Sequence, residues 1–96
     1  MKSEHILDGL KEVVRQLGIE VRSEKGNFRG GRCRVAGEDV IVLNRRHIPE
    51  IQISVLAQSI TAEEVDGLYM RPALRHALEA AWERAEFVPD ADGENE

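Results

Sequence analysis

The chain has few of the side chains on which metal, redox and nucleic-acid sites usually depend. A single cysteine, Cys33, excludes a disulfide within the chain and a zinc site built from cysteines alone. Aromatic residues make up 4% of the sequence, whereas RNA-binding surfaces usually stack bases on aromatic rings beside their positive charge. Only Phe28 and Tyr69 are placed to serve in that way. The composition therefore argues against RNA binding.

Long apolar runs are also missing. No segment approaches the roughly 20 apolar residues of a membrane-spanning helix, and the N-terminus has no apolar stretch typical of a secretory signal. The net charge of −5 opposes general affinity for nucleic acids, because such affinity needs basic patches that displace counterions. We therefore expect a cytoplasmic protein that binds neither membranes nor nucleic acids.

The hydrophobic pattern predicts an α+β fold. Apolar residues recur at helical spacing over 3–17, and alternating or continuous apolar character predicts strands over 19–22, 32–35 and 40–43. Because short connections favour pairing between neighbours, we expect a three-stranded antiparallel β-meander. The entirely apolar strand at 40–43 indicates either a central position in the sheet or cover on both of its faces.

Helices are expected after the strands. Pro49 and Pro72 are well placed as the first residues of two helices, and the segment 61–64 has the spacing of a capping box for a short helical turn. The prediction is a helix, the meander, and then two to three helices packed on one face of the sheet. This single domain should span residues 1–88 and be followed by an acidic disordered tail at 89–96.

Positive charge is concentrated in the middle of the chain. Residues 22–47 carry seven basic and three acidic side chains, a net of +4, and the remainder carries six basic and fifteen acidic ones, a net of −9. Groups of arginines recognise carboxylates or phosphates through paired N–H donors. We therefore expect a basic binding surface formed by Arg29, Arg32, Arg34, Arg45 and Arg46.

The direction of these arginines depends on the strand at 32–35. Successive side chains of a strand point to opposite faces, so Arg32 and Arg34 should face water while Cys33 and Val35 face the core. The alternative interpretation is a solvated sheet face, or one whose arginines are paired within the protein. The acidic partners available for such pairing are Glu20, Glu24 and Glu38.

A glycine pair and the cysteine raise a second hypothesis. Gly30 and Gly31, with Phe28 anchoring their loop, allow backbone amides to approach an anion, but no phosphate-loop motif and no following helix accompany them. A β-bulge or a close backbone crossing is the simpler interpretation. Cationic neighbours raise the thiolate fraction of a cysteine such as Cys33. The second hypothesis is thus a small enzyme that uses Cys33 or an anion pocket near the glycines.

The histidines do not indicate a metal site. The three of them are dispersed, without His-x-x-x-His spacing. His76, Glu79 and Glu83 share one side of a predicted helix, but a carboxylate metal site takes ligands from several helices. We therefore expect neither a metal nor a cofactor.

The order of a helix, short strands and a strand ending at Asn44 resembles the core of the ImmA/IrrE-type minimal zinc peptidases, where a helix reading approximately L-A-H-E-L-x-H follows. Residues 56–60 match the apolar frame of that helix. Gln58 stands where the first zinc-binding histidine would be, Ser59 where the general-base glutamate would be, and Ala62 where the second histidine would be. The resemblance therefore implies a related scaffold without the catalytic residues. The Gly-Gly-x-Cys strand also resembles that of small bacterial proteins of unassigned function.

The leading hypothesis from the sequence is a non-catalytic binding or protein-interaction module. Its basic sheet face would meet an acidic partner, either another protein or a second copy of this chain. The opposed charges of residues 22–47 and of the remainder of the chain motivate this hypothesis.

Overall fold

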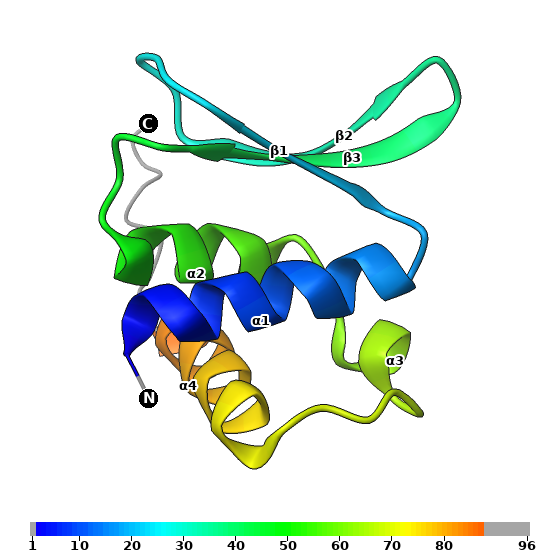
Figure 1. Ribbon diagram of the computed structural model, residues 1–96, viewed down its shortest axis with the longest axis vertical. Coiled ribbons are helices and arrows are strands. Elements are labelled where there is room, and N and C mark those ends of the chain that lie inside the picture. Colours follow the sequence, from blue (N-terminus) through cyan, green and yellow to red (C-terminus); the bar gives the residue numbers. More distant parts are fainter. Residues whose placement is uncertain (1, 88–96) are drawn as a thin grey trace.

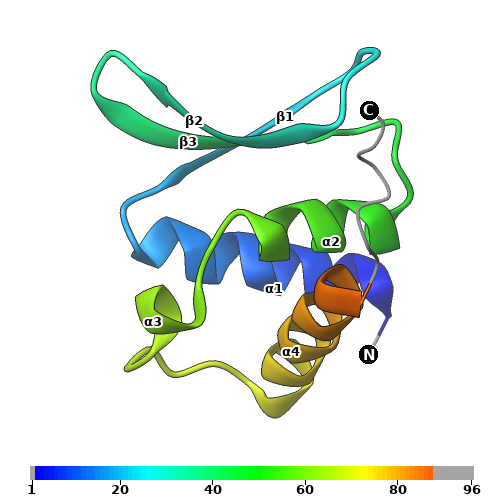
Figure 2. The ribbon, with the colours of Figure 1, turned by 180° about the vertical axis from the view of Figure 1, so that it is seen from behind.

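The computed structural model describes residues 2–87, and it confirms the α+β class. A three-stranded sheet forms one layer, and the helices lie on one side of it (Figures 1 and 2). The expected acidic tail at 89–96 lies outside the described residues. The elements are α1 (Ser3–Gln16), β1 (Glu20–Glu24), β2 (Gly30–Val35), β3 (Glu38–Asn44), α2 (Pro49–Gln58), α3 (Ala62–Val65) and α4 (Pro72–Phe87).

The sheet is mixed, so the prediction of an antiparallel meander was wrong. The strand order is β1-β3-β2, with β1 parallel and β2 antiparallel to β3. The loop after β1 crosses the end of the sheet, and the hairpin between β2 and β3 then returns the chain to the middle. The apolar run 40–43 explains this order, because a central strand buries its side chains best while the charged strands β1 and β2 tolerate the edges. The expected central position of that run is confirmed.

The termini of the helices follow their sequence signals in most cases. Pro49 and Pro72 open α2 and α4, and Gly18 follows α1 with a φ of 85°. Thr61 caps α3 in a full capping box. Ser3, although a good capping residue, lies inside α1, and its hydroxyl donates to Glu50 Oε2 on α2 at 2.7 Å.

The core lies between the sheet and the helices. α1 contributes the apolar stripe that its spacing predicts, and α2 lies between the sheet and α4 (Figure 1). The indole Nε1–H of Trp82 on α4 donates to the carbonyl oxygen of Ala57 at 2.7 Å, which ties the two helices together. No helix within residues 2–87 combines the length and apolar content that a bilayer crossing requires. Residues completely buried in this core include Leu10, Val14, Ile41, Leu43, Leu56 and Leu78.

Strand register decides which side chains of the sheet face the helices. Ile41 and Leu43 of β3 belong to the core, and residues paired across the ladder share a face. Arg32 pairs with Ile41, and therefore lies on the helix side of β2. Cys33 pairs with Val40 and lies on the opposite face, over which no helix passes in the described part of the chain. That opposite face is called the open face below.

The predicted directions of the β2 side chains were therefore reversed. Cys33 is exposed, and Val35 retains 42% of its accessible surface. Arg32 and Arg34 instead lie on the helix side, where they form ion pairs with Glu64 and Asp39. Alternation along a strand was correctly recognised, but alternation alone does not tell which of the two faces is covered.

Candidate binding site at the end of the sheet

A buried asparagine assembles the loops at one end of the sheet. Asn44, the last residue of β3, is only 3% exposed. Its Nδ2 amide donates to the carbonyl oxygens of Gly26 at 2.8 Å and Phe28 at 2.7 Å, while its Oδ1 accepts the backbone N–H of Arg46 at 3.0 Å. One side chain thus satisfies three backbone groups, and it holds the loop before β2 against the turn after β3.

Other contacts strengthen this junction. The backbone N–H of Arg45 donates to the carbonyl oxygen of Glu24 at 2.9 Å, which extends the pairing of β3 with β1 by one residue. The half-buried ring of Phe28 packs over Gly26, where an added Cβ would lie 2.7 Å from Phe28 Cε2. Phe28 therefore anchors its loop through both its ring and its carbonyl group.

Strand direction brings four cationic residues to this end. β1 and β3 are parallel and both finish here, whereas the antiparallel β2 begins here. The loop after β1 carries Lys25 and Arg29, and the turn after β3 carries Arg45 and Arg46. All four residues are exposed, and the ion pairs found within residues 2–87 include none of them. These four residues are called the basic end.

The remaining arginines of the sheet have carboxylate partners. On the open face, Arg22 Nε lies 2.9 Å from Glu20 Oε2, and this contact lowers the pKa of the Glu20 carboxyl. Arg34 Nε lies 3.2 Å from Asp39 Oδ1, near the hairpin of β2 and β3. Their charges are therefore compensated within the protein.

Arg32 is the most extensively bound arginine. Its Nη2 lies 3.0 Å from Asp39 Oδ2, and its Nη1 lies 2.9 Å from Glu64 Oε2 and 3.1 Å from the carbonyl oxygen of Ser59. Hydrogen bonds from Arg32, and then from Arg34, hold the pKa of Asp39 below its usual range. The pKa of Glu64 is lowered first by the backbone N–H of Thr61 and also by Arg32. Arg32 therefore joins β2 to the end of α2 and the start of α3.

The structure thus separates the five predicted binding arginines. Arg29, Arg45 and Arg46 lie at the basic end, whereas Arg32 and Arg34 belong to an internal network. Internal pairing had been the alternative interpretation, but the partners are Asp39 and Glu64 rather than three glutamates chosen from the sequence. Glu64 is distant in the sequence, which explains why local spacing did not reveal it.

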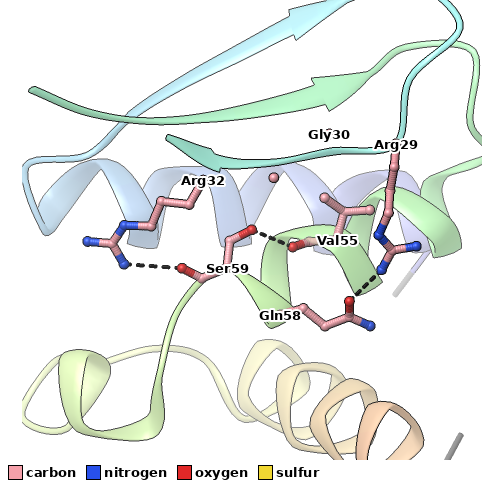
Figure 3. A pocket seen from close by; sticks show the side chains of 7 residues that line it. Arg29, Gly30, Arg32, Val55, Gln58 and Ser59 are labelled. Atoms are coloured by element: carbon pink, nitrogen blue, oxygen red, sulfur yellow. Dashed lines mark hydrogen bonds between the residues drawn. The ribbon is translucent and has the colours of Figure 1, made fainter. Parts of the chain in front are cut away.

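A cleft of about 420 Å³ lies between the start of β2 and the last turns of α2. Figure 3 shows Arg29 and Arg32 on its two sides, with Val55 between them. The Arg29 guanidinium donates to the side-chain oxygen of Gln58. We call this feature the arginine cleft; the residues that line it are Arg29, Gly30, Gly31, Arg32, Val55, Gln58 and Ser59.

Gly30 keeps this cleft open and lets β2 begin close to β3. Gly30 has a φ of 98°, and an added Cβ there would collide with the carbonyl oxygen of Val42. Gly31 has a φ of 143° and would accept a Cβ without collision in space, although its backbone conformation is one that other residues rarely adopt. Gly30 thus marks a close backbone approach, as the simpler interpretation of the pair held, and both glycines line the cleft.

No protein-family model matches the chain, and no curated protein or solved structure is significantly similar to it. The assignment of function therefore depends on the site itself.

The residues considered for catalysis lie apart from one another. Cys33 is on the open face, whereas the arginine cleft lies on the helix side of β2. The hydroxyl of Ser59 donates to the carbonyl oxygen of Val55 at 2.7 Å, within its own helix. Within residues 2–87, no group of three or more histidine, cysteine or acidic side chains is placed to hold a metal ion.

Asn44, Gln58 and Lys25 are site residues that sequence reasoning missed. Asn44 was noted only as the end of a strand, although a lone polar residue closing an apolar run is a signal for a buried hydrogen-bonding role. Gln58 was considered only as a substitute for a zinc ligand. Lys25 was counted in the basic segment but was not assigned to the surface.

Proposed function

We propose that this chain is a non-catalytic binding module whose basic end recognises an acidic segment of another protein. The observation that carries the proposal is the gathering of Lys25, Arg29, Arg45 and Arg46 by the buried side chain of Asn44. Neighbouring arginines are neutralised by carboxylates, whereas these four have none among the described ion pairs. Four uncompensated positive charges at one end of the sheet attract an anionic partner.

The charge distribution favours an acidic protein segment over a nucleic acid. The whole chain carries a net charge of −5, so a long polyanion would meet repulsion beyond the basic end. A short acidic segment contacts only the local positive region. Such binding should weaken with added salt, because exposed charges are screened over about 8 Å at physiological ionic strength.

The resemblance to minimal zinc peptidases is compatible with a binding role. Gln58, Ser59 and Ala62 replace the residues that would bind zinc and activate water in that family. A scaffold of that kind would retain its surface loops while lacking the chemistry. The second hypothesis, a small enzyme, expects an exposed thiol and a pocket beside the glycine pair, and Cys33 is exposed while Gly30 and Gly31 line the arginine cleft. The thiol and the cleft lie on opposite faces of β2, which disfavours a reaction that uses both.

A charge-reversal experiment tests the proposed function. The probe is a fluorescently labelled octaglutamate peptide, and binding is followed by anisotropy at low and at high salt. The double variant Arg45→Glu, Arg46→Glu should bind the peptide at least about tenfold more weakly, since two favourable ion pairs become repulsive. The fold should persist, because Asn44 contacts the backbone of Arg46 rather than its side chain.

A matched control reverses two exposed arginines elsewhere. The double variant Arg15→Glu, Arg71→Glu changes the net charge by the same amount, at the end of α1 and the start of α4. Its affinity should stay within about threefold of the original. Equal losses in both double variants would contradict a localised site. Sedimentation of the unliganded protein at two concentrations separates a foreign partner from a second copy, since only the latter gives concentration-dependent association.

A further inference from the structure

Building on the proposed function, we infer that the arginine cleft receives one glutamate side chain of the acidic partner. In this arrangement the Arg29 guanidinium donates hydrogen bonds to the carboxylate, and Gln58 accepts from Arg29 when the partner is absent. The inference gives the basic end a specific pocket in addition to its general positive charge.

The bonding of Arg29 is the first observation behind this inference. Arg22, Arg32 and Arg34 each contact a carboxylate, whereas Arg29 donates to the neutral amide oxygen of Gln58. Hydrogen bonds between a guanidinium and a carboxylate are charge-assisted and often bidentate, and they are roughly twice as strong as neutral ones. An incoming carboxylate can therefore displace Gln58 from Arg29. Until then the amide holds the Arg29 guanidinium beside the cleft.

The two sides of the cleft have different roles. Arg32 is already paired with the carboxylates of Asp39 and Glu64 and bonded to the carbonyl oxygen of Ser59, so it forms a fixed wall. A carboxylate should therefore bind on the Arg29 side.

The floor of the cleft suits an aliphatic stem. Val55 is 3% exposed and contributes apolar surface beneath the glycine pair (Figure 3). Because Gly30 carries no side chain, the space over Val55 stays open; an added Cβ there would lie 3.5 Å from Val55 Cγ1. The two methylene groups of glutamate can lie on Val55 while its carboxylate reaches Arg29. Arg29 belongs to both the cleft and the basic end, so one acidic segment can occupy both.

Gln58→Glu is the decisive variant. A carboxylate at position 58 would pair with Arg29 permanently and compete with the ligand, so octaglutamate should bind about tenfold more weakly. The fold should remain intact, since this variant adds an ion pair and removes no packing. Gln58→Ala should bind at least as tightly as the original, because Arg29 loses its neutral partner.

Ala62→Glu supplies the matched control. This exposed position at the start of α3 acquires the same added negative charge and does not line the arginine cleft. Its affinity for octaglutamate should fall less than about threefold. In ¹H–¹⁵N spectra of the original protein, the Gly30 and Gly31 amides and the Arg29 side-chain Nε–H should shift saturably on addition of octaglutamate. In Gln58→Glu those shifts should be lost.

The outcomes separate this inference from the proposed function. If Gln58→Glu and Ala62→Glu lose affinity equally, or if the Gly30 and Gly31 amides do not respond, the cleft assignment is wrong while the loss in the Arg45→Glu, Arg46→Glu variant still supports the basic end. If none of these variants weakens binding, both proposals fail. If free glutarate produces the same saturable shifts as octaglutamate at equal concentration, the ligand is a small carboxylate and the assignment to a protein side chain is overturned.

Discussion

The arginines at the two ends of the sheet differ in whether they have carboxylate partners. At the hairpin end, Arg32 and Arg34 are neutralised by Asp39 and Glu64, and the network ties β2 to the helices. At the basic end, cations from two loops lie together with no carboxylate among their described partners. Both sets of arginines come from the same positively charged segment of the sequence. The difference shows that excess charge along a chain does not by itself define a charged surface, because tertiary contacts decide which charges are compensated.

Removing the side chain that assembles the basic end should have the largest effect. Asn44→Ala loses three hydrogen bonds at a buried position and leaves two carbonyl groups without their donor. We expect the free energy of unfolding to fall by about 2–3 kcal/mol, measured by urea denaturation. Octaglutamate binding should weaken at the same time, because the two loops are no longer held together.

Asn44→Asp provides a sharper version of this experiment. Aspartate keeps the size of the side chain and the acceptor for the Arg46 amide, but it replaces the two N–H donations with repulsion between oxygens. It should therefore destabilise the protein at least as much as alanine does near neutral pH. Full stability in Asn44→Asp would mean that the asparagine does not organise this end.

At the hairpin end, breaking the network of Arg32 should lower the free energy of unfolding less than Asn44→Ala does. Arg32→Ala removes the arginine donor from Glu64 and from the Ser59 carbonyl oxygen, but Glu64 keeps its hydrogen bond from the Thr61 backbone N–H, and the side chains involved are about a third exposed. We expect the free energy of unfolding to fall by about 1 kcal/mol. Arg34→Ala should lower the free energy of unfolding clearly less than Arg32→Ala does, because Asp39 keeps its contact with Arg32. Octaglutamate binding should change little in Arg34→Ala, since Arg34 belongs neither to the basic end nor to the arginine cleft.

The pH dependence of stability checks that the Arg32 effect is electrostatic. The pKa values of Asp39 and Glu64 are lowered in the folded protein. A lowered carboxyl pKa stabilises the fold above the pKa of the unfolded chain, near pH 4, and this contribution disappears as the pH falls through the folded value. Stability should therefore decrease less steeply between about pH 5 and pH 3 in Arg32→Ala than in the original. A similar slope in both proteins would attribute the effect to packing.

The comparison of the two ends also shows what the sequence could and could not predict. Capping and periodicity are local, so the helices at Pro49 and Pro72 and the capping box at Thr61 were correctly placed. The order of the strands depends on how well each one fills the centre of the sheet, which is a property of the whole fold. The apolar run 40–43 indicated that its strand is central. The prediction of a meander instead followed the preference for short connections, and it placed this strand at an edge.

The site was predictable to a similar degree. Arg29, Arg45 and Arg46 were recognised as candidates because charge is visible in the sequence. The pairing of Arg32 with Glu64, and the joining of two loops by Asn44, require contacts between residues 16 or more positions apart. Such contacts have no local signature. The predicted direction of the Cys33 side chain was wrong for a related reason. Alternation defines two faces of a strand, but it does not say which face the helices cover.

The smallest effect is expected at Cys33, which lies beside the hairpin-end network but on the open face. The thiol is exposed and pairs across the sheet with Val40, away from the Arg32 contacts. Cys33→Ser should therefore change the free energy of unfolding by less than about 0.5 kcal/mol and leave octaglutamate binding unaltered. In the native protein, a small thiol reagent should label Cys33 at a rate within about threefold of that for the protein unfolded in urea, since no packing shields it. Labelling that begins only when the protein unfolds would place the thiol in the core after all, and the assignment of the open face would then be wrong.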